Sequence, residues 1–374
     1  MEAYNLSTVT QFTLIGLSDL PGVRYPLFVV FAVIYQVTLL GNGAILLAIG
    51  AERKLHTPMY FFLANLSLLD ISCPSATVPK MLDNLLTEQH SISFLGCAVQ
   101  LYFLVALAGT EVFLLAVMAY DRYVAICFPL RYSLIMTKAR CVQLTAATWA
   151  AGFLNSLLHT VFTFRLSFCK SNRVNQYYCD IPPVVALACS STYVAEMLVL
   201  VVGGVLGIGA YLITFVSYVY IISTILKIQS VEGKRKAFST CASHLLVVCL
   251  FYGAAIFTYI RPNSSQNSPA RDRLISMLYG VITPMLNPMI YSLRNTEVKN
   301  ALRKVLQMSL CTQRKFQVNG QNWRCHSGDT KSKSNYIVHK QDMDKGKQAG
   351  LYAFRPSNGV LELGAGHEGS LLSV

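Results

Sequence analysis

The sequence predicts an all-α membrane protein, a bundle of seven transmembrane helices. Three observations predict it: the apolar composition, seven long apolar segments, and the positions of the basic residues between them. Of the 374 residues, 53% are hydrophobic and only 13% are charged, whereas soluble domains carry about 25% charged residues. The composition therefore favours a chain that lies largely within a lipid bilayer.

Seven apolar segments are each long enough to span a bilayer as a helix, which takes about 20 residues. They cover about 27–50, 57–80, 94–127, 141–164, 193–226, 237–260 and 272–293. The first 25 residues have no apolar core of the kind found in signal peptides, so the first segment is expected to insert the chain. An odd number of spans places the two termini on opposite sides of the membrane.

The basic residues indicate which side is cytoplasmic, because short cytoplasmic loops are rich in Lys and Arg. One set of connections carries Arg53, Lys54, Arg131, Lys138, Arg140, Lys227, Lys234, Arg235, Lys236, Arg294, Lys299, Arg303 and Lys304. On the opposite side, Asn5 begins an N-glycosylation sequence, Asn-Leu-Ser. We therefore expect residues 1–26 to be an extracellular N-terminus and the C-terminus to be cytoplasmic.

The cysteine positions agree with this topology. Of the eleven cysteines, four fall on the outer side, and these are Cys97, Cys169, Cys179 and Cys189. Four cysteines in an oxidising compartment can form two disulfides, and their positions alone leave three connectivities open. Cysteines inside the spans are expected to be small apolar packing residues.

The region after the seventh segment has two parts. Residues 294–306 are expected to form a short amphipathic cytoplasmic helix on the inner leaflet, because Val298, Leu302 and Val305 share one helical face. The segment 307–374 is polar, rich in Gly, Ser, Lys and Gln, and has no apolar periodicity. This composition predicts a disordered cytoplasmic tail.

Two acidic residues, Asp70 and Glu111, lie well inside predicted spans, with no basic residue at a similar depth. An ionisable group in hydrocarbon is costly unless it is paired or hydrated. The two carboxyl groups either share a sodium ion or are protonated and hydrogen-bonded, and the sequence supports both interpretations equally.

Other classes of protein fit less well. The net charge of +13 is spread in single residues and short groups between apolar runs, so no basic face for nucleic acid is expected. A transporter or channel usually has inverted repeats or helices interrupted at the midplane, and an intramembrane enzyme needs a catalytic or metal-binding cluster. The sequence contains neither pattern, so we expect no enzymatic activity.

Short motifs follow the predicted spans in a specific order. They are GN at 41–42, LHTPMYFFLANLSLLD at 55–70, MAYDRYVAICFPLRY at 118–132, SY at 217–218, KAFSTCASH at 236–244 and PMLNPMIYSLRN at 284–295. With these motifs the chain resembles the olfactory receptors, a family of rhodopsin-like G-protein-coupled receptors, from residue 1 to about residue 306. Two departures are Phe128, where many members have a polar residue, and the long tail.

The resemblance implies a function and a location. It implies an odorant receptor that binds small, mostly hydrophobic volatile molecules and activates a stimulatory, olfactory-type heterotrimeric G protein, which raises cyclic AMP. It also implies a multi-pass protein of the plasma membrane, in the cilia of olfactory sensory neurons, with no nucleic acid as partner.

The resemblance also assigns roles to individual residues. A switch that contacts the G protein is implied for Asp121, Arg122, Tyr123, Tyr218, Asn287, Pro288 and Tyr291. By itself, the Asp121–Arg122 pair would be an interfacial ion pair worth about 0–1 kcal/mol. Disulfides are implied between Cys97 and Cys179 and between Cys169 and Cys189. Helix-orienting roles are implied for Asn42, Asp70 and Trp149; Asp70 with Glu111 matches the sodium or protonation site, and His244 is either a packing histidine or a proton switch.

A ligand pocket is expected in the outer half of the bundle. Helical spacing of three and four residues aligns one face of the third span and one face of the sixth. The candidate lining residues are Leu101, Leu104, Val105, Ala108, Val202, Leu206, Tyr252, Ala255, Ile256, Tyr259, Met277 and Gly280. Such stripes are more often helix-to-helix packing, and the resemblance is what favours a pocket here. Tyr259 is the expected hydrogen-bond donor to an otherwise apolar ligand.

Overall fold

We describe the protein from a computed structural model. The described residues are 9–16, 21–87, 90–169, 171–259, 269–294 and 297–304, and in the tail 315–318, 321–327, 336–340, 351–357 and 360–365. Side chains are not described at 21, 236, 239–240, 254–259, 269–272, 279 and 291–294, or in the tail strands. The chain has two compact units, 1–298 and 299–374.

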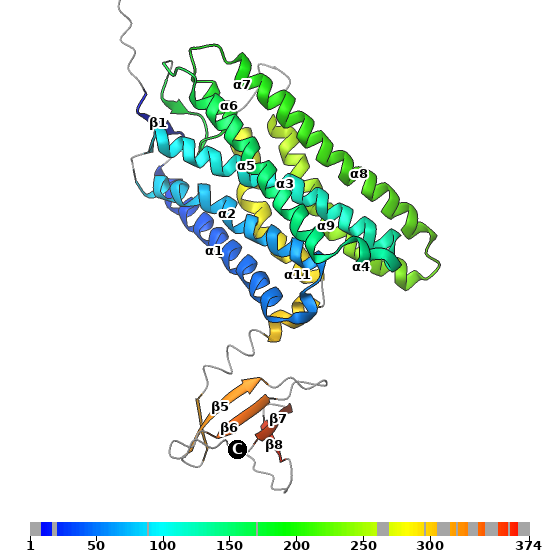
Figure 1. Ribbon diagram of the computed structural model, residues 1–374. Helices are drawn as coiled ribbons and strands as arrows, with labels where there is room; N and C mark the ends of the chain where they lie inside the picture. The colour runs from blue at the N-terminus through cyan, green and yellow to red at the C-terminus, as the bar shows by residue number, and fades with distance from the viewer. Residues whose placement is uncertain are drawn as a thin grey trace, which may run out of the picture. The chain divides into compact units, whose positions relative to one another are not determined.

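Seven long helical segments form a bundle in the first unit (Figure 1). The first four are α1 (Pro21–Ala51), α2 (Pro58–Leu86), α3 (Phe94–Cys127) and α5 (Lys138–Phe164). The fifth runs from α7 (Tyr193–Leu198) through the π-helical turn η3 (Val199–Gly203) into α8 (Gly204–Lys227), and the sixth is α9 (Val231–Tyr259). The seventh joins α10 (Pro269–Met277), the π-helical η4 (Leu278–Ile282) and α11 (Thr283–Arg294). The predicted helical membrane bundle is thereby confirmed.

Length and apolarity alone identify four of these segments as candidate membrane spans within the described residues: Gly22–Ala51, Pro58–Leu86, Phe94–Cys127 and Tyr193–Lys227. A shorter apolar stretch, Cys241–Gly253, lies in α9. The helices α5 and α9 begin with basic residues, such as Lys138 and Lys234, which lower their average apolarity.

Short elements connect the helices. On the side where α3 ends, these are η1 (Arg53–Leu55), η2 (Pro129–Arg131) and α4 (Tyr132–Ile135); α6 (Ile181–Val185) lies in the loop before α7. Caps set some of the helix starts, because a side-chain oxygen satisfies a free backbone N–H group there. The Ser93 hydroxyl accepts from Gly96 N at 3.0 Å, and the Thr137 hydroxyl accepts from Arg140 N at 3.3 Å.

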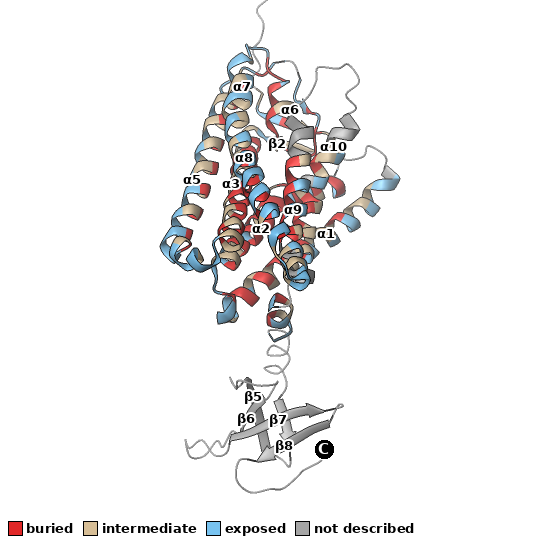
Figure 2. Cartoon of the chain, turned by 90° about the vertical axis from the view of Figure 1, so that its right-hand side faces the viewer, coloured by how far each residue is buried: buried red, intermediate tan, exposed pale blue. Residues whose placement is uncertain are grey.

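Burial follows the pattern expected in a bilayer (Figure 2). Buried residues face the other helices, whereas large apolar side chains such as Leu40, Leu47 and Val205 are exposed on the outside of the bundle. Contiguous exposed apolar surface of this kind is unusual in a soluble monomer, so it indicates contact with lipid tails.

One helix pair packs especially closely. A Cβ atom added at Gly152 of α5 would lie 2.7 Å from the carbonyl oxygen of Ala106 and 2.8 Å from the backbone nitrogen of Thr110, both in α3. Small residues at helix interfaces allow backbones to approach in this way. Glycine at 152 therefore sets how near α5 lies to α3.

The outer end carries a small sheet with strand order β2-β1-β3. The strand β1 (Gln11–Leu14) pairs antiparallel with β2 (Ser91–Ser93) and parallel with β3 (Arg173–Val174). Phe12 of β1 is fully buried, with its ring centroid 5.9 Å from Phe94 and 5.5 Å from Phe168. A strand of four residues carries too weak a pattern to be recognised from the sequence.

Residues 297–304 are helical, inside the predicted range 294–306. Tyr60 of α2 donates a hydrogen bond to Glu297 Oε2 at 2.9 Å, which connects the start of this helix to the bundle. The second unit contains an antiparallel sheet of β4 (Lys315–Val318), β5 (Gln321–Ser327), β6 (Tyr336–Lys340), β7 (Leu351–Ser357) and β8 (Val360–Ala365). The disordered cytoplasmic tail expected from the composition of 307–374 stays a prediction.

Candidate functional site

The inner end of α3 carries the first group of candidate residues. Asp121 and Arg122 are both buried, with 2% and 6% of their surfaces exposed. Tyr132, the first residue of α4, donates its hydroxyl to Asp121 Oδ1 at 2.8 Å. Burial and the nearby Asp121 carboxyl raise the pKa of Tyr132 well above its usual value, so this tyrosine stays protonated and remains a donor.

The fifth and sixth helical segments meet beside Arg122. The hydroxyl of Tyr218 in α8 lies 2.7 Å from His244 Nδ1 in α9, and the two rings are stacked with centroids 5.8 Å apart. Arg122 is near enough to both residues to interact with them electrostatically. His244 is completely buried. The structure thus brings together Arg122, Tyr218 and His244, which lie on three different helices.

Apolar packing closes this inner end. Ala119, Ile221, Ile225 and Cys241 form a buried cluster with Tyr218, and Tyr123 and Ile126 pack against it from α3. In this arrangement α8 and α9 cover the α3 residues that the resemblance assigns to G-protein contact. Of the other switch residues, Asn287 and Pro288 lie in α11, and the side chain of Tyr291 lies outside the described residues.

The middle of the bundle holds the two acidic residues. Asp70 and Glu111 are 1% and 4% exposed, and they are close enough to interact electrostatically. Asn287 Nδ2 donates to both carboxyl oxygens of Asp70, at 2.8 and 3.1 Å. Asn42 Nδ2 donates to the carbonyl oxygens of Thr38 and Pro284, both at 3.1 Å, and so connects α1 to α11.

Oxygen atoms are the available ligands in this central region. The side-chain Oδ1 atoms of Asn42 and Asn287 are buried and have no hydrogen-bond partner. Oxygen ligands of this kind suit a hard cation such as sodium. Within the described part of the chain, no group of three or more His, Cys, Asp or Glu residues is placed to hold a metal ion. Trp149 of α5 donates to Asn65 Oδ1 of α2 at 3.3 Å, which connects these two helices.

The predicted ligand residues are brought together in part. Tyr252 of α9 places its hydroxyl 3.5 Å from the Val112 carbonyl of α3, and its ring centroid is 5.5 Å from that of Tyr211 in α8. Leu104 and Leu101 are buried, and Leu101 packs in a cluster with Cys179 and the start of the fifth segment. The half-buried candidates are Val105, Ala108, Val202, Met277 and Gly280.

Four candidates remain. Leu206 is 37% exposed. The side chains of Ala255, Ile256 and Tyr259 lie outside the described residues, so the expected donor is not placed. Tyr211 joins the group unexpectedly. Sequence reasoning missed it because only the third and sixth spans were searched for aligned faces, although its position in an apolar span was visible.

The loop before α7 closes over the outer end. Disulfides join Cys97 to Cys179 and Cys169 to Cys189, with sulfur–sulfur distances of 1.95 and 2.00 Å. Gln100 Oε1 accepts from Cys179 N at 2.9 Å. The spacing of three residues from Cys97 put Gln100 on the same helical face, a signal that could have found it. Gln176 Nε2, also in this loop, donates to Ser276 Oγ at 3.0 Å.

Comparison with known proteins agrees with this architecture. A family model described as olfactory receptor matches residues 31–309. The chain is 50% identical over 306 residues to olfactory receptor 8U9 of Mus musculus. The aligned region covers 82% of this chain and 97% of the relative. It is 50% identical to olfactory receptor 8U8 of Homo sapiens and 51% identical to olfactory receptor-like protein OLF3 of Canis lupus familiaris, each over 82% of this chain and 96% of the relative. The chain therefore belongs to the olfactory receptor family, the odorant-binding, G-protein-coupled receptors of the plasma membrane, which are not enzymes.

Proposed function

We propose that this receptor binds a small, mostly hydrophobic volatile molecule between the outer halves of α3, α8 and α9 and activates a stimulatory-type G protein, which raises cyclic AMP. One observation carries the proposal. Tyr252, beside the ligand region, and His244, beside Arg122, lie on the same helix. Eight residues of α-helix span about 12 Å, so a shift of α9 caused by a ligand is transmitted to the contacts around Arg122.

The ligand region suits a neutral molecule with one polar group. Leu104, Val105 and Ala108 supply apolar contacts, and the Tyr252 hydroxyl is within reach of an oxygen-bearing ligand. An apolar pocket with a few placed polar groups binds such ligands by shape and one or two hydrogen bonds. Tyr259 remains the proposed donor, about two helical turns beyond Tyr252.

The inner surface offers a place for a partner. Leu130 and Leu134, in the segment that follows α3, are 95% and 76% exposed, and Phe238 of α9 is 52% exposed. Exposed apolar side chains grouped at one end of a molecule commonly mark a protein interaction site. A G-protein helix that enters next to Arg122 would cover them and replace the Tyr218–His244 contact.

The disulfides support the proposed orientation. Both disulfides and the strand β1 lie at the end of the bundle where α3 begins, and disulfides form on the oxidising side of a membrane. The N-terminus is therefore proposed to be extracellular, and the end bearing Arg122 cytoplasmic. The cilia of olfactory sensory neurons are the proposed location, as the membrane that meets inhaled volatiles.

Sodium is the proposed ion between Asp70 and Glu111. The unpartnered Oδ1 atoms of Asn42 and Asn287 would add neutral oxygen ligands to the two carboxylates. Replacing sodium by N-methylglucamine at constant chloride should lower the thermal stability of the purified receptor, and Asp70→Asn should remove that dependence. Equal stability in both cations would instead support protonated carboxyl groups.

The test of function is a cyclic-AMP reporter screen of the full chain against small volatiles, with Arg122→Ala as the inactive control. For an oxygen-bearing agonist, Tyr259→Phe should raise the half-maximal concentration about five- to one-hundred-fold and leave a hydrocarbon analogue nearly unchanged. Ala108→Phe should block both ligands by filling the space. Unchanged responses in both variants would place the pocket elsewhere, and a response that persists in Arg122→Ala would refute the coupling role.

A further inference from the structure

The loop between α5 and α7 covers the outer end of the bundle. Its residues Gln176, Tyr177 and Tyr178 are almost completely buried, with 4%, 1% and 6% of their surfaces exposed. Burial of this kind is uncommon for a loop, since connecting segments usually run over the surface of a protein. We call the segment 176–178 the outer plug. A molecule that enters the bundle from its outer end has to move this plug aside.

The plug is fixed on the side of α3. The disulfide between Cys179 and Cys97 joins the residue after the plug covalently to α3. Gln100, about one helical turn further along α3, accepts a hydrogen bond from Cys179 N at 2.9 Å and donates to the Ala76 carbonyl oxygen of α2 at 2.9 Å. The covalent bond does not break during thermal motion, so the plug stays attached to α3.

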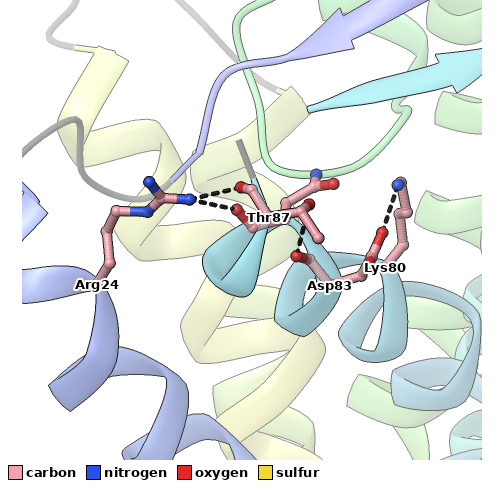
Figure 3. A network of polar contacts seen from close by, with 5 residues as sticks. Arg24, Lys80, Asp83 and Thr87 are labelled. Atoms are coloured by element: carbon pink, nitrogen blue, oxygen red, sulfur yellow. Dashed lines mark hydrogen bonds and ion pairs between the residues drawn. The ribbon is translucent and has the colours of Figure 1, made fainter. Parts of the chain in front are cut away.

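The outer rim is also held on the side of α1 and α2 (Figure 3). Arg24 Nη2 of α1 donates to the carbonyl oxygens of Asn84 and Thr87 at the end of α2, at 3.3 and 2.5 Å. Hydrogen bonds from a charged donor are stronger than neutral ones. The loop itself is paired with the N-terminal segment, since Ile15 N donates to the Val174 carbonyl oxygen at 2.9 Å. We therefore expect this side to stay closed as well.

On the side of the seventh helical segment, a neutral side-chain hydrogen bond holds the plug. Gln176 Nε2 donates to Ser276 Oγ of α10 at 3.0 Å, and Ser276 is buried. A neutral hydrogen bond contributes much less net stability than a disulfide. Arg273 Nη1 of α10 donates to the Gly16 carbonyl oxygen at 2.6 Å, so α10 itself is tied to the N-terminal segment. Opening on this side therefore moves the plug rather than α10.

A native thiol lies behind the plug. Cys73 of α2 is buried and is close enough to Tyr177 of the plug to interact with it electrostatically. Cys73 also interacts electrostatically with Glu111 in the middle of the bundle. The Tyr177 hydroxyl oxygen lies 3.9 Å from the position that a Cβ atom at Gly280 would take, so the plug borders the ligand region proposed above. Modification of Cys73 by a small reagent therefore reports when the interior behind the plug is accessible.

We propose that the Gln176–Ser276 hydrogen bond is the latch of an outer gate. When it breaks, the plug moves away from α10 while the Cys97–Cys179 disulfide holds it at α3, and small neutral molecules enter the bundle through that opening. Gln176 and Ser276 are positioning residues, which control access and are not part of the ligand lining. The inference rests on the proposed ligand region, but its test needs neither an odorant nor a G protein, so the two proposals can fail separately.

The experiment measures how fast methyl methanethiosulfonate, a small neutral molecule, modifies Cys73 in the purified full-length receptor in lipid nanodiscs. The reagent transfers its methylthio group to a thiol, and peptide mass spectrometry measures the modified fraction of each cysteine. Ser276→Ala and Gln176→Leu each remove the latch. Each should raise the modification rate of Cys73 about fivefold, the factor by which one net hydrogen bond shifts an equilibrium. The double variant should show the same factor, because both changes break the same bond.

Two controls separate opening of the gate from a general loss of stability. Ser190→Ala makes the same substitution elsewhere in the same loop, where Ser190 Oγ accepts from Ser167 N at 3.0 Å. Cys73 should react at the wild-type rate in this variant. Cys141, a buried free cysteine at the start of α5, is the internal reference, and its modification rate should be the same in all variants.

Three results would overturn the proposal. The first is an equal Cys73 rate in the wild type and the two latch variants, which is expected if the reagent enters from the lipid. The second is a joint rise at Cys73 and Cys141, which would indicate general unfolding. The third is an effect of the double variant equal to the product of the two single effects, since independent changes combine in that way.

Discussion

The two ends of the bundle are closed in different ways. At the outer end, two disulfides and the β2-β1-β3 sheet join the N-terminal segment, the start of α3 and the loop before α7. At the inner end, the contacts around Arg122 are side-chain hydrogen bonds from Tyr132 and Tyr218 and an apolar cluster. One end is closed by covalent bonds and backbone pairing, the other by contacts that a partner can replace.

The two kinds of contact also differ in how much free energy they contribute. Removing a native disulfide typically costs about 2–5 kcal/mol, whereas one hydrogen bond contributes about 1 kcal/mol net. A ligand can shift an equilibrium only by its difference in affinity for the two states, commonly a few kcal/mol. We therefore expect rearrangement on ligand binding to occur at the inner end, while the outer end stays closed around the ligand.

The largest effect is expected at the inner end. Arg122→Ala should abolish agonist-driven cyclic-AMP signalling, because it removes the charged donor proposed to meet the G protein. Arg140→Ala is the matched control, since it removes an exposed arginine from the same side of the membrane. Signalling by the variants and the wild type is compared at equal amounts of receptor on the cell surface. If Arg122→Ala signalled like the wild type, the contrast between the two ends would lose its functional meaning.

The next effect is expected at the outer end. Cys97→Ser should lower the free energy of unfolding by about 2–5 kcal/mol and reduce the amount of receptor at the cell surface. Cys249→Ser, at an exposed free cysteine, should have little effect on either quantity. Surface staining and thermal melting measure the two outcomes. A Cys97→Ser receptor that melts with the wild type would show that the outer end does not depend on its covalent closure.

A smaller loss of stability is expected for a change in the α3–α5 helix pair, which connects the two ends. Gly152→Ala should destabilise the receptor by about 1–3 kcal/mol, the usual cost of overpacking, because the added methyl group meets the α3 backbone. At Gly109, on the facing helix, an added Cβ would lie 3.5 Å from the Gly152 Cα, an ordinary contact. Gly109→Ala should therefore melt close to the wild type. Similar melting of both variants would contradict the close approach of α3 and α5.

A milder change should loosen the inner end without disabling it. Tyr132→Phe removes the hydrogen bond to Asp121, worth about 1 kcal/mol, which corresponds to about a fivefold shift in an equilibrium. Signalling without agonist should rise by up to that factor. Tyr220→Phe, at a tyrosine that is 55% exposed, serves as the control. Unchanged basal signalling in Tyr132→Phe would mean that this contact does not hold the closed form.

The smallest effect is expected for an exposed ion pair at the outer end. Lys80→Met breaks the pair with Asp83, whose side chain is 51% exposed. Pairs of this kind contribute about 0–1 kcal/mol, and the loss should shrink further at high salt. Thermal melting at two salt concentrations measures it. If Lys80→Met lowered the stability more than Gly152→Ala does, surface charges would be shown to help close the outer end.

Helix positions were largely predictable, because hydropathy depends on the local sequence. The third span was predicted at 94–127, and α3 covers Phe94–Cys127. Other helices extend beyond the apolar segments that predicted them. The second span was predicted to end at residue 80, but α2 continues to Leu86 and includes Lys80 and Asp83. A helix outside the hydrocarbon no longer needs apolar side chains, so hydropathy underestimates its length.

Contacts within the candidate site were less predictable. The motifs identified Arg122, Tyr218 and Asp70, but the hydrogen bond between Tyr132 and Asp121 and the one between Gln176 and Ser276 were found only in the structure.

The sequence by itself determined that this chain crosses a membrane, where its helices lie and to which family it belongs, since apolar length and short motifs are local properties. The tertiary structure decided which polar groups meet. Asn287 and Asp70 are 217 residues apart, and Tyr60 and Glu297 are 237 apart. In hydrocarbon a polar group needs a partner, but which partner it finds depends on how whole helices pack, and that is a property of the complete bundle.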